Sequence, residues 1–566
     1  MKASDYIVSF LSERGVKVVF GYIGGMITHL VDSLAQSEDV RYIQTYHEQT
    51  AAIAAEGYAL ESGKFGVAIC TSGPGATNLM TGIADAYFGS IPVLYISGQV
   101  NTHEYKYNKP IRQQGFQETD IVSIVKPITK YAVMIDDAYN LRYELEKAVH
   151  IATTGRKGPV VIDLPMDISR AEINPSELKS YIPEIEKTDS YDLAEVVSII
   201  NSASRPMLLV GGGCQSEKSK ELLTSFIKQT QIPVVTSLMG KGAVDETYIN
   251  HIGMIGSYGN RCANMAIAES DILLALGTRL DTRQTGAMVE EFLPKGKIIH
   301  VDIDKNELEH HRLNNRIKLN SSVEDFLQTL TQQYFSPKGN SNWIKRIQLL
   351  KSKYNQENEV EKFVANKAPY RFIQTLNNIT QEDDIITVDI GQNQMWAAQT
   401  VKLKRGQKFI TSGGLAPMGF SLPVAIGMAF ASPDKTIYAI TGDGGLHISI
   451  QSLLLISQYN LNIKIIVLNN NALGMITQFQ SLYFNGRMKG TTSQGGFINP
   501  DYKEIAIAYG LIYVARNEES LSTIKEDLAI HNIFYEYQID DLTTVSPKLE
   551  YNRPINQPSP QINENE

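Results

Sequence analysis

An acid and an amide follow two neighbouring apolar runs in the last third of the chain. Asp443 comes shortly after residues 437–441, a β-branched run, and Asn470 comes shortly after residues 464–468, a second apolar run. Residues 446–459 between them carry Leu and Ile at helical spacing, so the pattern predicts a strand, a helix and a second strand. Parallel strands joined by one right-handed crossover end at the same edge of a sheet. We therefore expect Asp443 and Asn470 to meet, although they are distant in the sequence.

The chemistry of these two side chains suits a metal-bound phosphate. Carboxylate and amide oxygens are hard ligands of the kind that Mg²⁺ prefers, and Mg²⁺ usually completes its shell with phosphate oxygens and water. Gly442, Gly444 and Gly445 leave room for a phosphate, and their N–H groups lie where the following helix begins, a position that favours anions. Gly-Asp-Gly alone is also an ordinary turn, and Asn-Asn an ordinary strand end. Their order and spacing together predict a metal-bound phosphate or diphosphate.

The whole chain has the length and composition of a multidomain globular protein rather than a nucleic-acid or membrane protein. Its 566 residues allow three or four domains, and the net charge of −9 leaves no broad basic surface for nucleic acid. No apolar run has bilayer-spanning length, and the N-terminus does not resemble a signal peptide. Cys70, Cys214 and Cys262 stand in mostly apolar contexts, so we expect reduced packing residues in a cytoplasmic protein.

Strand and helix patterns alternate from end to end, which predicts the α/β class with doubly wound parallel sheets. A polar, Pro-containing stretch at 165–190 and a charged stretch at 340–370, which we interpret as a helical connector, separate the apolar regions. The end of the chain is rich in Pro, Asn and Gln. We expect three domains, 1–170, 190–335 and 365–545, and an extended or disordered tail, 546–566.

Six further motifs carry a family resemblance. They are "VVFGYIGG" from Val18, "TYHEQTAAIAAEGYAL" from Thr45, "TSGPGATN" from Thr71, "RQQGFQETD" from Arg112, "DIGQNQMWAAQ" from Asp389 and "SGGLAPMGFSLPVAIG" from Ser412. With them the chain resembles the thiamine-diphosphate-dependent acetolactate (acetohydroxyacid) synthases over nearly its whole length. The resemblance implies a pyrimidine-binding domain at 1–170, a central FAD-binding-type domain at 190–335 and a diphosphate- and magnesium-binding domain at 365–545.

The resemblance also implies roles for particular residues. Asp443, Asn470 and the main-chain oxygen of Ala472 would bind Mg²⁺, and Met418 would hold thiamine diphosphate in its bent conformation; without the resemblance, Met418 would be interpreted as a core residue. The other residues expected to contact this cofactor are Pro74, Asn78, Gln117, Gly391, Gln392, Asn393, Gly442, Gly444, Gly445, Leu473, Gly474 and Met475.

Glu48 is the expected catalytic residue. An acid before an apolar helix is also a favourable charge at a helix N-terminus. In the family the matching glutamate bonds N1′ of the cofactor's aminopyrimidine and so assists removal of the C2 proton, which is a general acid/base task suited to a carboxylate. Because the family pairs the pyrimidine domain of one subunit with the diphosphate domain of another, we expect a homodimer or homotetramer.

The central domain carries flavin-like motifs, including "LLVGGGCQ" from Leu208 and "ALGTRLDTRQTG" from Ala275. Glycines after a strand allow close approach of a pyrophosphate, and arginines supply positive partners. The resemblance implies a structural FAD, because carboligation needs no net redox chemistry. The expected FAD contacts are Gly211, Gly212, Gly213, Ser237, Leu238, Met239, Gly277, Arg279, Asp281, Arg283, Asp302 and Ile303.

Three expected substrate residues, Phe116, Met166 and Phe479, lie in a region that departs from the family. Phe479 stands where the synthases carry a tryptophan, and Met166 where they carry a lysine. These replacements make the entrance of the substrate channel less cationic than in the synthases. They therefore weaken the case for a second substrate that carries a carboxylate. The chain also resembles the carboligases of yersiniose (branched-chain deoxysugar) biosynthesis, which add the two-carbon unit of pyruvate to a ketone of a nucleotide-linked deoxysugar and keep FAD.

From the sequence we therefore favour pyruvate as donor and a ketone, such as a nucleotide-linked keto-deoxysugar, as acceptor. The alternative is an acetolactate synthase that uses a second 2-keto acid, and a further alternative is a pyruvate oxidase or decarboxylase relative. A non-catalytic binding paralogue is disfavoured because Glu48, Asp443 and Asn470 are all present.

Overall fold

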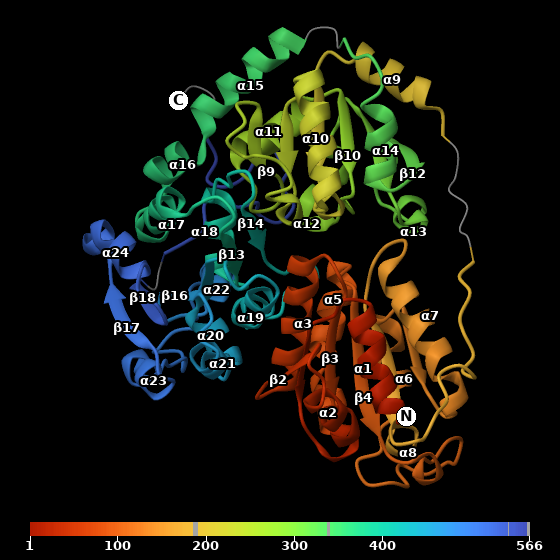
Figure 1. Cartoon of the computed structure of the whole chain (residues 1–566). Coiled ribbons are helices and arrows are strands. Elements are labelled where there is room, and N and C mark those ends of the chain that lie inside the picture. The colour runs from red at the N-terminus through yellow and green to blue at the C-terminus, as the bar shows by residue number, and fades with distance from the viewer. Residues whose placement is uncertain (185–190, 337–339, 541–542, 563–566) are drawn as a thin grey trace.

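The computed structural model of the chain describes residues 1–184, 191–336, 340–540 and 543–562 (Figure 1). It contains three six-stranded sheets whose neighbouring strands all pair in parallel. The expected α/β class with doubly wound parallel sheets is confirmed. Residue 190, where we expected the central domain to begin, and residues 563–566 of the expected tail lie outside the described residues.

The first and third sheets have the same topology. The strand orders are β2-β1-β3-β4-β6-β5 and β14-β13-β15-β16-β18-β17. The strands of the first sheet are β1 (Val18–Tyr22), β2 (Arg41–Gln44), β3 (Gly66–Cys70), β4 (Val93–Gln99), β5 (Tyr131–Met134) and β6 (Val160–Pro165). Those of the third are β13 (Ile385–Val388), β14 (Lys408–Ile410), β15 (Ile437–Gly442), β16 (Ile463–Asn469), β17 (Ile512–Arg516) and β18 (Ile533–Gln538).

The middle sheet has the order β12-β11-β10-β7-β8-β9, which is the strand order of dinucleotide-binding folds. Its strands are β7 (Pro206–Val210), β8 (Val234–Thr236), β9 (His251–Met254), β10 (Ile272–Leu276), β11 (Lys297–Asp302) and β12 (Arg316–Asn320).

Helices cover both faces of each sheet (Figure 1). Around the first sheet lie α1 (Ala3–Glu13), α2 (Thr28–Ala35), α3 (Glu48–Ser62), α4 (Pro74–Asn78), α5 (Met80–Gly89), α6 (Ile121–Val125), α7 (Leu141–Thr153) and α8 (Met166–Ser169). The central region has α9 (Leu193–Ser202), α10 (Glu217–Thr230), α11 (Arg261–Glu269), α12 (Thr282–Thr285), α13 (Lys305–Glu309) and α14 (Val323–Leu330), and α15 (Asn340–Tyr354) and α16 (Gln356–Phe363) form the connector. The third region has α17 (Ala368–Ile379), α18 (Gln392–Thr400), α19 (Ser421–Ala431), α20 (Asp443–Ser449), α21 (Ser452–Gln458), α22 (Gly474–Tyr483), α23 (Tyr502–Ala508) and α24 (Ile524–Leu528).

Helices α3 and α19 join the first and third sheets into one buried core (Figure 1). The helices touch through glycines, because a Cβ on Gly57 would lie 2.1 Å from the oxygen of Val424 and a Cβ on Gly427 would lie 1.8 Å from the oxygen of Ala54. Any larger side chain at either position would push the helices apart. The apolar sequence of α3 is therefore buried by both domains.

The structure differs from the expected helix at 446–459. That segment is divided into α20, which already begins at Asp443, and α21. Asp443 begins the helix early because its carboxylate accepts a hydrogen bond from the N–H of Gly444. The division falls where the N–H groups of Leu453 and Leu454 donate to carbonyls three residues earlier. These bonds replace the α-helical bonds to carbonyls four residues earlier, so the α-helix is interrupted there.

The expected tail has no helix or strand in its described part, but it is held in place. Ile555 is buried, and the guanidinium of Arg261 donates to the carbonyl oxygens of Pro558 (3.0 Å) and Pro560 (2.8 Å). Ser546 donates to Glu359, which also pairs with Arg261. These contacts fasten the described tail against the central region and the connector.

All three cysteines are buried free thiols. In the part of the chain that the structure describes, no helix combines the length and the apolar character needed to cross a membrane.

Candidate active site

The expected magnesium ligands lie at one edge of the third sheet. Strands β13, β15 and β16 are neighbours, and the order of the chain reverses between β13 and β15. Ligands of open α/β sheets bind beyond the carboxyl ends of the strands at such a reversal. Asp443 follows β15, and Asn470 follows β16. The βαβ geometry thus brings the acid and the amide to the same edge.

Asp443 is buried and joins two of these strand ends. Its Oδ1 accepts from the N–H of Gly444 at 2.9 Å, and its Oδ2 accepts from the N–H of Ala472 at 3.0 Å. Burial raises the pKa of Asp443 above its usual range, although these hydrogen bonds oppose that rise. The Nδ2 of Asn470 donates to Oε1 of Gln392 at 3.2 Å, which leaves its Oδ1 available to a ligand. A buried carboxylate, an amide oxygen and a main-chain oxygen form a donor set that fits Mg²⁺.

Sequence reasoning missed Asn499, which donates a further hydrogen bond to Asp443. Its Nδ2 donates to Oδ2 of Asp443 at 3.0 Å, to Oδ1 of Asn469 at 3.1 Å and to Oδ1 of Asn471 at 3.2 Å. Its own Oδ1 lies 3.0 Å from Nε2 of His447. Asn499 lies in an irregular polar segment, where no periodicity marks a residue as functional.

The glycines expected to receive the diphosphate are in tight contact with their neighbours. A Cβ on Gly444 would lie 2.5 Å from Cδ2 of Leu473 and 2.8 Å from Cε of Met418. A Cβ on Gly474 would lie 1.9 Å from Oε1 of Gln392. Larger residues would therefore displace the side chains expected to contact the cofactor. Met475 packs against the apolar core nearby.

Asp389 is a second residue that sequence reasoning did not single out. It is fully buried, and its carboxylate accepts from the N–H groups of Gly419 (2.9 Å) and Ser421 (3.0 Å). Burial raises its pKa to about 6. Its main-chain oxygen accepts from Asn393, whose Oδ1 faces the glycines at 391 and 442. A Cβ on Gly445 would lie 2.7 Å from the Asp389 carboxylate, which explains the glycine there.

Glu48 lies in the first turn of α3 and is nearly buried, with 7 % of its surface exposed. His47 caps the helix by accepting from the N–H of Gln49 at 3.1 Å. Asn78, in the helix that begins at Pro74, donates to Oε2 of Glu48 at 2.9 Å. The expected residues Glu48, Pro74 and Asn78 therefore form one group, and Gln117 lies close by, because its Cβ is 3.1 Å from a Cβ built on Gly73.

These residues form two groups on two domains of the chain. Near the start of α3, Thr50 accepts from Gln451 at 3.3 Å, and Tyr46 donates to Gln458 at 3.4 Å. The Glu48 group thus faces the region of α21, whereas the Asp443 group lies at the end of β15.

The three expected substrate residues lie on separate segments. Phe116 is 78 % exposed in a loop of the first domain, and Met166 begins α8 in that domain. Phe479 is on α22 of the third domain, where its ring lies 4.6 Å from that of Tyr483. Within one chain Phe479 therefore lies on a different domain from Phe116 and Met166.

The expected flavin residues gather at the edge of the middle sheet where β7 and β10 meet. Gly211 and Gly213 follow β7 and contact Gly277 after β10: a Cβ on Gly211 would lie 2.2 Å from the Gly277 oxygen. This is the strand reversal at which dinucleotides bind. The tight glycine contacts and the two arginines after β10 fit a pyrophosphate.

The other flavin residues lie beside these loops. Ser237 caps the short turn that contains Leu238 and Met239, and Gly212 packs against Met239. Arg279 pairs with Asp281 at 3.3 Å, and Arg283 lies over the ring of Tyr258. Burial raises the pKa of Asp302, at the end of β11, to about 6. Asn320 donates to the main-chain oxygens of Asp302 and Ile303.

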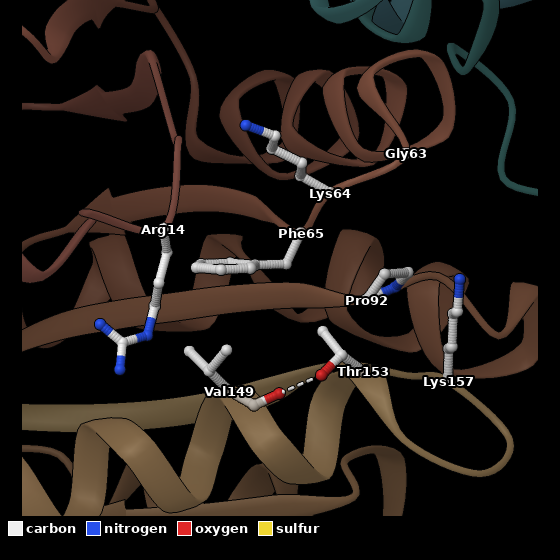
Figure 2. A pocket seen from close by; sticks show the side chains of 8 residues that line it. All are labelled: Arg14, Gly63, Lys64, Phe65, Pro92, Val149, Thr153 and Lys157. Carbon is white, nitrogen blue, oxygen red and sulfur yellow. Dashed lines mark hydrogen bonds between the residues drawn. The ribbon is translucent and has the colours of Figure 1, made fainter. Parts of the chain in front are cut away.

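A cavity of about 390 Å³ lies on the first domain between Arg14, Lys64 and Lys157 (Figure 2). Its cationic groups point apart in Figure 2 rather than toward a common centre. Arg14 stacks on Phe10, and Lys64 donates to the oxygen of Gly15. This arrangement offers no built anion site, and none of the expected site residues lines the cavity.

Comparison with known proteins identifies the family of this chain. Three stretches match thiamine pyrophosphate enzymes: residues 1–124 the N-terminal TPP binding domain, 193–330 the central domain and 389–533 the C-terminal TPP binding domain. The chain is 36 % identical over 537 residues to the acetolactate synthase large subunit of Lactococcus lactis, covering 93 % of this chain and 90 % of that protein. The chain belongs to the thiamine-diphosphate-dependent acetolactate synthase family.

Two further relatives have similar coverage. The probable acetolactate synthase large subunit of Methanocaldococcus jannaschii is 38 % identical over 526 residues, covering 90 % of this chain and 87 % of that protein. The large subunit of acetolactate synthase isozyme 2 of Escherichia coli is 36 % identical over 514 residues, covering 90 % of each. The family resemblance found in the sequence is confirmed, and the chain is a thiamine-diphosphate-dependent enzyme that forms carbon–carbon bonds.

Proposed function

We propose that this protein decarboxylates pyruvate and joins the two-carbon unit to a second 2-keto acid, as an acetolactate (acetohydroxyacid) synthase. The observation that carries the proposal is the identity of 33 to 38 % over nearly whole lengths to proteins named acetolactate synthase large subunits. These comparisons favour the 2-keto acid over the keto-deoxysugar acceptor that we favoured from the sequence.

In this proposal the chain binds the diphosphate through magnesium. Asp443, Asn470 and the main-chain oxygen of Ala472 bind Mg²⁺, supported by the contacts of Asp443 at the two strand ends. The glycines of the turn at 442–445 give the phosphates access to backbone N–H groups. Asn499 keeps the carboxylate of Asp443 in place by its 3.0 Å hydrogen bond.

Glu48 holds a proton at N1′ of the aminopyrimidine. The hydrogen bond from Asn78 to Oε2 fixes the carboxylate and leaves Oε1 available, so this oxygen would be the one to exchange the proton. Because Glu48 is nearly buried, little water competes for the hydrogen bonds of its carboxylate, and this strengthens them. Thiamine diphosphate, when bound, supplies the electron sink for decarboxylation.

The Glu48 group and the Asp443 group lie on different domains of the chain, which supports a homodimer or homotetramer. In such an assembly the first domain of one subunit meets the third domain of another and completes each site. FAD in the middle domain is supported by the glycine contacts at the β7–β10 reversal, and its role would be structural. We place the protein in the cytoplasm because its cysteines are buried free thiols.

A second candidate acceptor is a ketone, such as a nucleotide-linked keto-deoxysugar. The observation that favours it is the pair of uncharged side chains, Met166 and Phe479, at positions where the family carries lysine and tryptophan. An uncharged entrance does not attract a second carboxylate as strongly as a cationic one.

The test is to incubate the purified enzyme with thiamine diphosphate, Mg²⁺, FAD and pyruvate, with and without a nucleotide-linked 4-keto-deoxysugar, and to identify the products by mass spectrometry. Acetolactate as the main product in both mixtures supports the proposal. A two-carbon adduct of the sugar with little acetolactate would replace it with the ketone acceptor. Free acetaldehyde or oxygen-dependent peroxide would instead indicate a decarboxylase or an oxidase.

A further inference from the structure

Two buried acids face each other where the first and third domains meet. Glu56 on α3 and Asp85 on α5 are 0 % and 2 % exposed, and their carboxyl groups lie within hydrogen-bonding reach of each other. Neither oxygen of Glu56 has a donor among the described residues. Since two carboxylates offer only acceptors, one acid of the pair must carry a proton. We assign it to Glu56, because Asp85 already accepts from the hydroxyl of Ser412 whereas the Glu56 oxygens have no other donor. Burial raises the pKa of Glu56 well above its usual range, which agrees with this protonation state.

Asp85 is also hydrogen-bonded to a residue of the third domain. The hydroxyl of Ser412 donates to Oδ1 of Asp85, and the same hydroxyl accepts from the N–H of Ala416 at 3.0 Å. Ala416 has a left-handed φ of 58°, so its backbone needs such a support to hold its conformation. The chain of hydrogen bonds therefore runs from Glu56 through Asp85 and Ser412 to Ala416.

The loop that Ser412 begins carries Met418. Its far end is held by Asp389, which accepts from the N–H groups of Gly419 and Ser421. Two buried carboxylates from different domains thus hold the loop on either side of Met418. The methyl group of Met418 in turn approaches Gly444, where a Cβ would lie 2.8 Å away.

Helix α5, which carries Asp85, contacts the Met418 loop at a second point. A Cβ on Gly414 would lie 2.6 Å from Cβ of Phe88, one turn after Asp85 on α5. The loop therefore follows the position of α5 closely, and Asp85 fixes its register along that helix.

We propose that Glu56, Asp85 and Ser412 form a buried relay that positions the Met418 loop and thereby sets the affinity for thiamine diphosphate. The inference rests on the proposed function and on the placement of Met418 against that cofactor, which the family resemblance implies. Glu56 and Asp85 are positioning residues, because they act on the loop through Ser412. The relay explains why an acid pair is kept inside a core where apolar residues would pack at lower cost.

A second serine–carboxylate contact between the same domains provides a matched control. Ser432 donates to Oε1 of Glu61 at 2.7 Å, and Glu61 also lies on α3. Glu61 lies in the last turn of α3 and Ser432 follows the end of α19, whereas the Met418 loop precedes the start of α19. Ser412→Ala and Ser432→Ala therefore each remove one hydroxyl between the domains, but only Ser412 belongs to the relay.

The experiment measures binding of thiamine diphosphate to the apo-enzyme by titration calorimetry with Mg²⁺ present. Ser412→Ala is expected to weaken binding about tenfold, the effect of losing one hydrogen bond to a charged group. Ser432→Ala is expected to bind like the wild type. The melting temperature of each variant is measured as well, so that weaker binding caused by unfolding can be recognised.

The acid pair is tested by two variants of Glu56. Glu56→Ala leaves Asp85 without its donor and is expected to weaken binding about tenfold. Glu56→Gln keeps an N–H donor to Asp85 and is expected to restore binding to within about twofold of the wild type. Equal binding by both, or wild-type binding by Ser412→Ala, would overturn the relay. Failure of the wild type to bind thiamine diphosphate would instead contradict the proposed function.

Discussion

The side-chain amide of Asn78 donates a 2.9 Å hydrogen bond to the carboxylate of Glu48. The bond joins the first turn of α3 to the end of α4 and uses only one of the two carboxylate oxygens. The other oxygen lies close to Gly75, where a Cβ would be 3.2 Å away. Asn78 and Gly75 therefore fix the orientation of Glu48 and give its free oxygen room.

Glu48→Gln should retain the fold and the affinity for thiamine diphosphate but lose most of the activity. The amide keeps the shape of the side chain but cannot exchange a proton with a ring nitrogen. We expect kcat to fall by about 10²- to 10⁴-fold, the range for loss of a general acid/base group. Steady-state acetolactate formation and calorimetric cofactor binding measure the two effects. Glu13→Gln, at an exposed acid at the end of α1, is the control, and near-normal turnover of Glu48→Gln would remove Glu48 from this role.

Asn499→Ala should weaken the response to magnesium without abolishing it. The substitution removes the 3.0 Å bond that holds Asp443 but leaves the proposed ligands in place. We expect the Mg²⁺ concentration for half-maximal activity to rise about tenfold after the enzyme is stripped with a chelator and titrated. Asp443→Ala removes a ligand, so excess Mg²⁺ should not restore it. Equal magnesium curves for wild type and Asn499→Ala would show that Asn499 does not support the site.

The purified protein should carry flavin absorbance, and Arg279→Gln should bind FAD less tightly. Arg279 lies in the loop after β10, beside the glycine contacts expected to receive the pyrophosphate. Loss of one charge-assisted hydrogen bond corresponds to about a tenfold weaker affinity. Lys318→Gln, which removes an exposed partner of Glu309 in the same domain, should leave FAD binding unchanged. A colourless wild type that takes up no added FAD would contradict the flavin site.

The parts of the fold and site that were predictable are those set by local pattern. The apolar runs at 437–441 and 464–468 predicted β15 and β16, because buried parallel strands have continuous apolar sequences. The meeting of Asp443 with the segment after Asn470 followed from the crossover rule.

The contacts that were not predictable join segments distant in the chain. Asn499 reaches Asp443 from an irregular loop, and Asp85 reaches Ser412 across two domains. Neither residue differs in its local pattern from an ordinary loop amide or a helix acid. The interruption between α20 and α21 likewise depends on hydrogen-bond geometry rather than on periodicity.

Phe479→Trp should shift the acceptor preference between 2-keto acids. Phe479 is half exposed on α22 and stands where the family carries tryptophan. A larger ring changes the shape of the entrance, so we expect the ratio of 2-ketobutyrate to pyruvate use to change by about tenfold, the range for one modified pocket contact. Competition between the two acceptors measures this ratio. Phe484→Trp, at a neighbouring ring 5.8 Å from Phe479, is the control, and the same ratio in all three proteins would remove Phe479 from the entrance.

The pH dependence of stability should reflect Asp163, which is buried in β6. It accepts from Ser97 at 2.6 Å and from Gln99 at 2.8 Å, and burial raises its pKa to about 7. Between its ordinary pKa and about 7 the folded protein holds this proton whereas the unfolded chain releases it. The stabilisation is complete below the ordinary pKa and is lost as the pH rises through about 7. The contribution of Asp163 therefore makes the protein less stable at about pH 8 than at about pH 5.5.

Asp163→Asn cannot ionise, so it should reduce the difference in melting temperature between those two pH values by several degrees. Asp39→Asn is the matched control, because Asp39 also accepts from a serine, Ser12, but at an exposed site. If both Asp163→Asn and Asp39→Asn retain the wild-type pH dependence of the melting temperature, the buried proton is not on Asp163. If only Asp163→Asn flattens the dependence, a neutral Asp163 inside β6 is the source of the alkaline loss of stability.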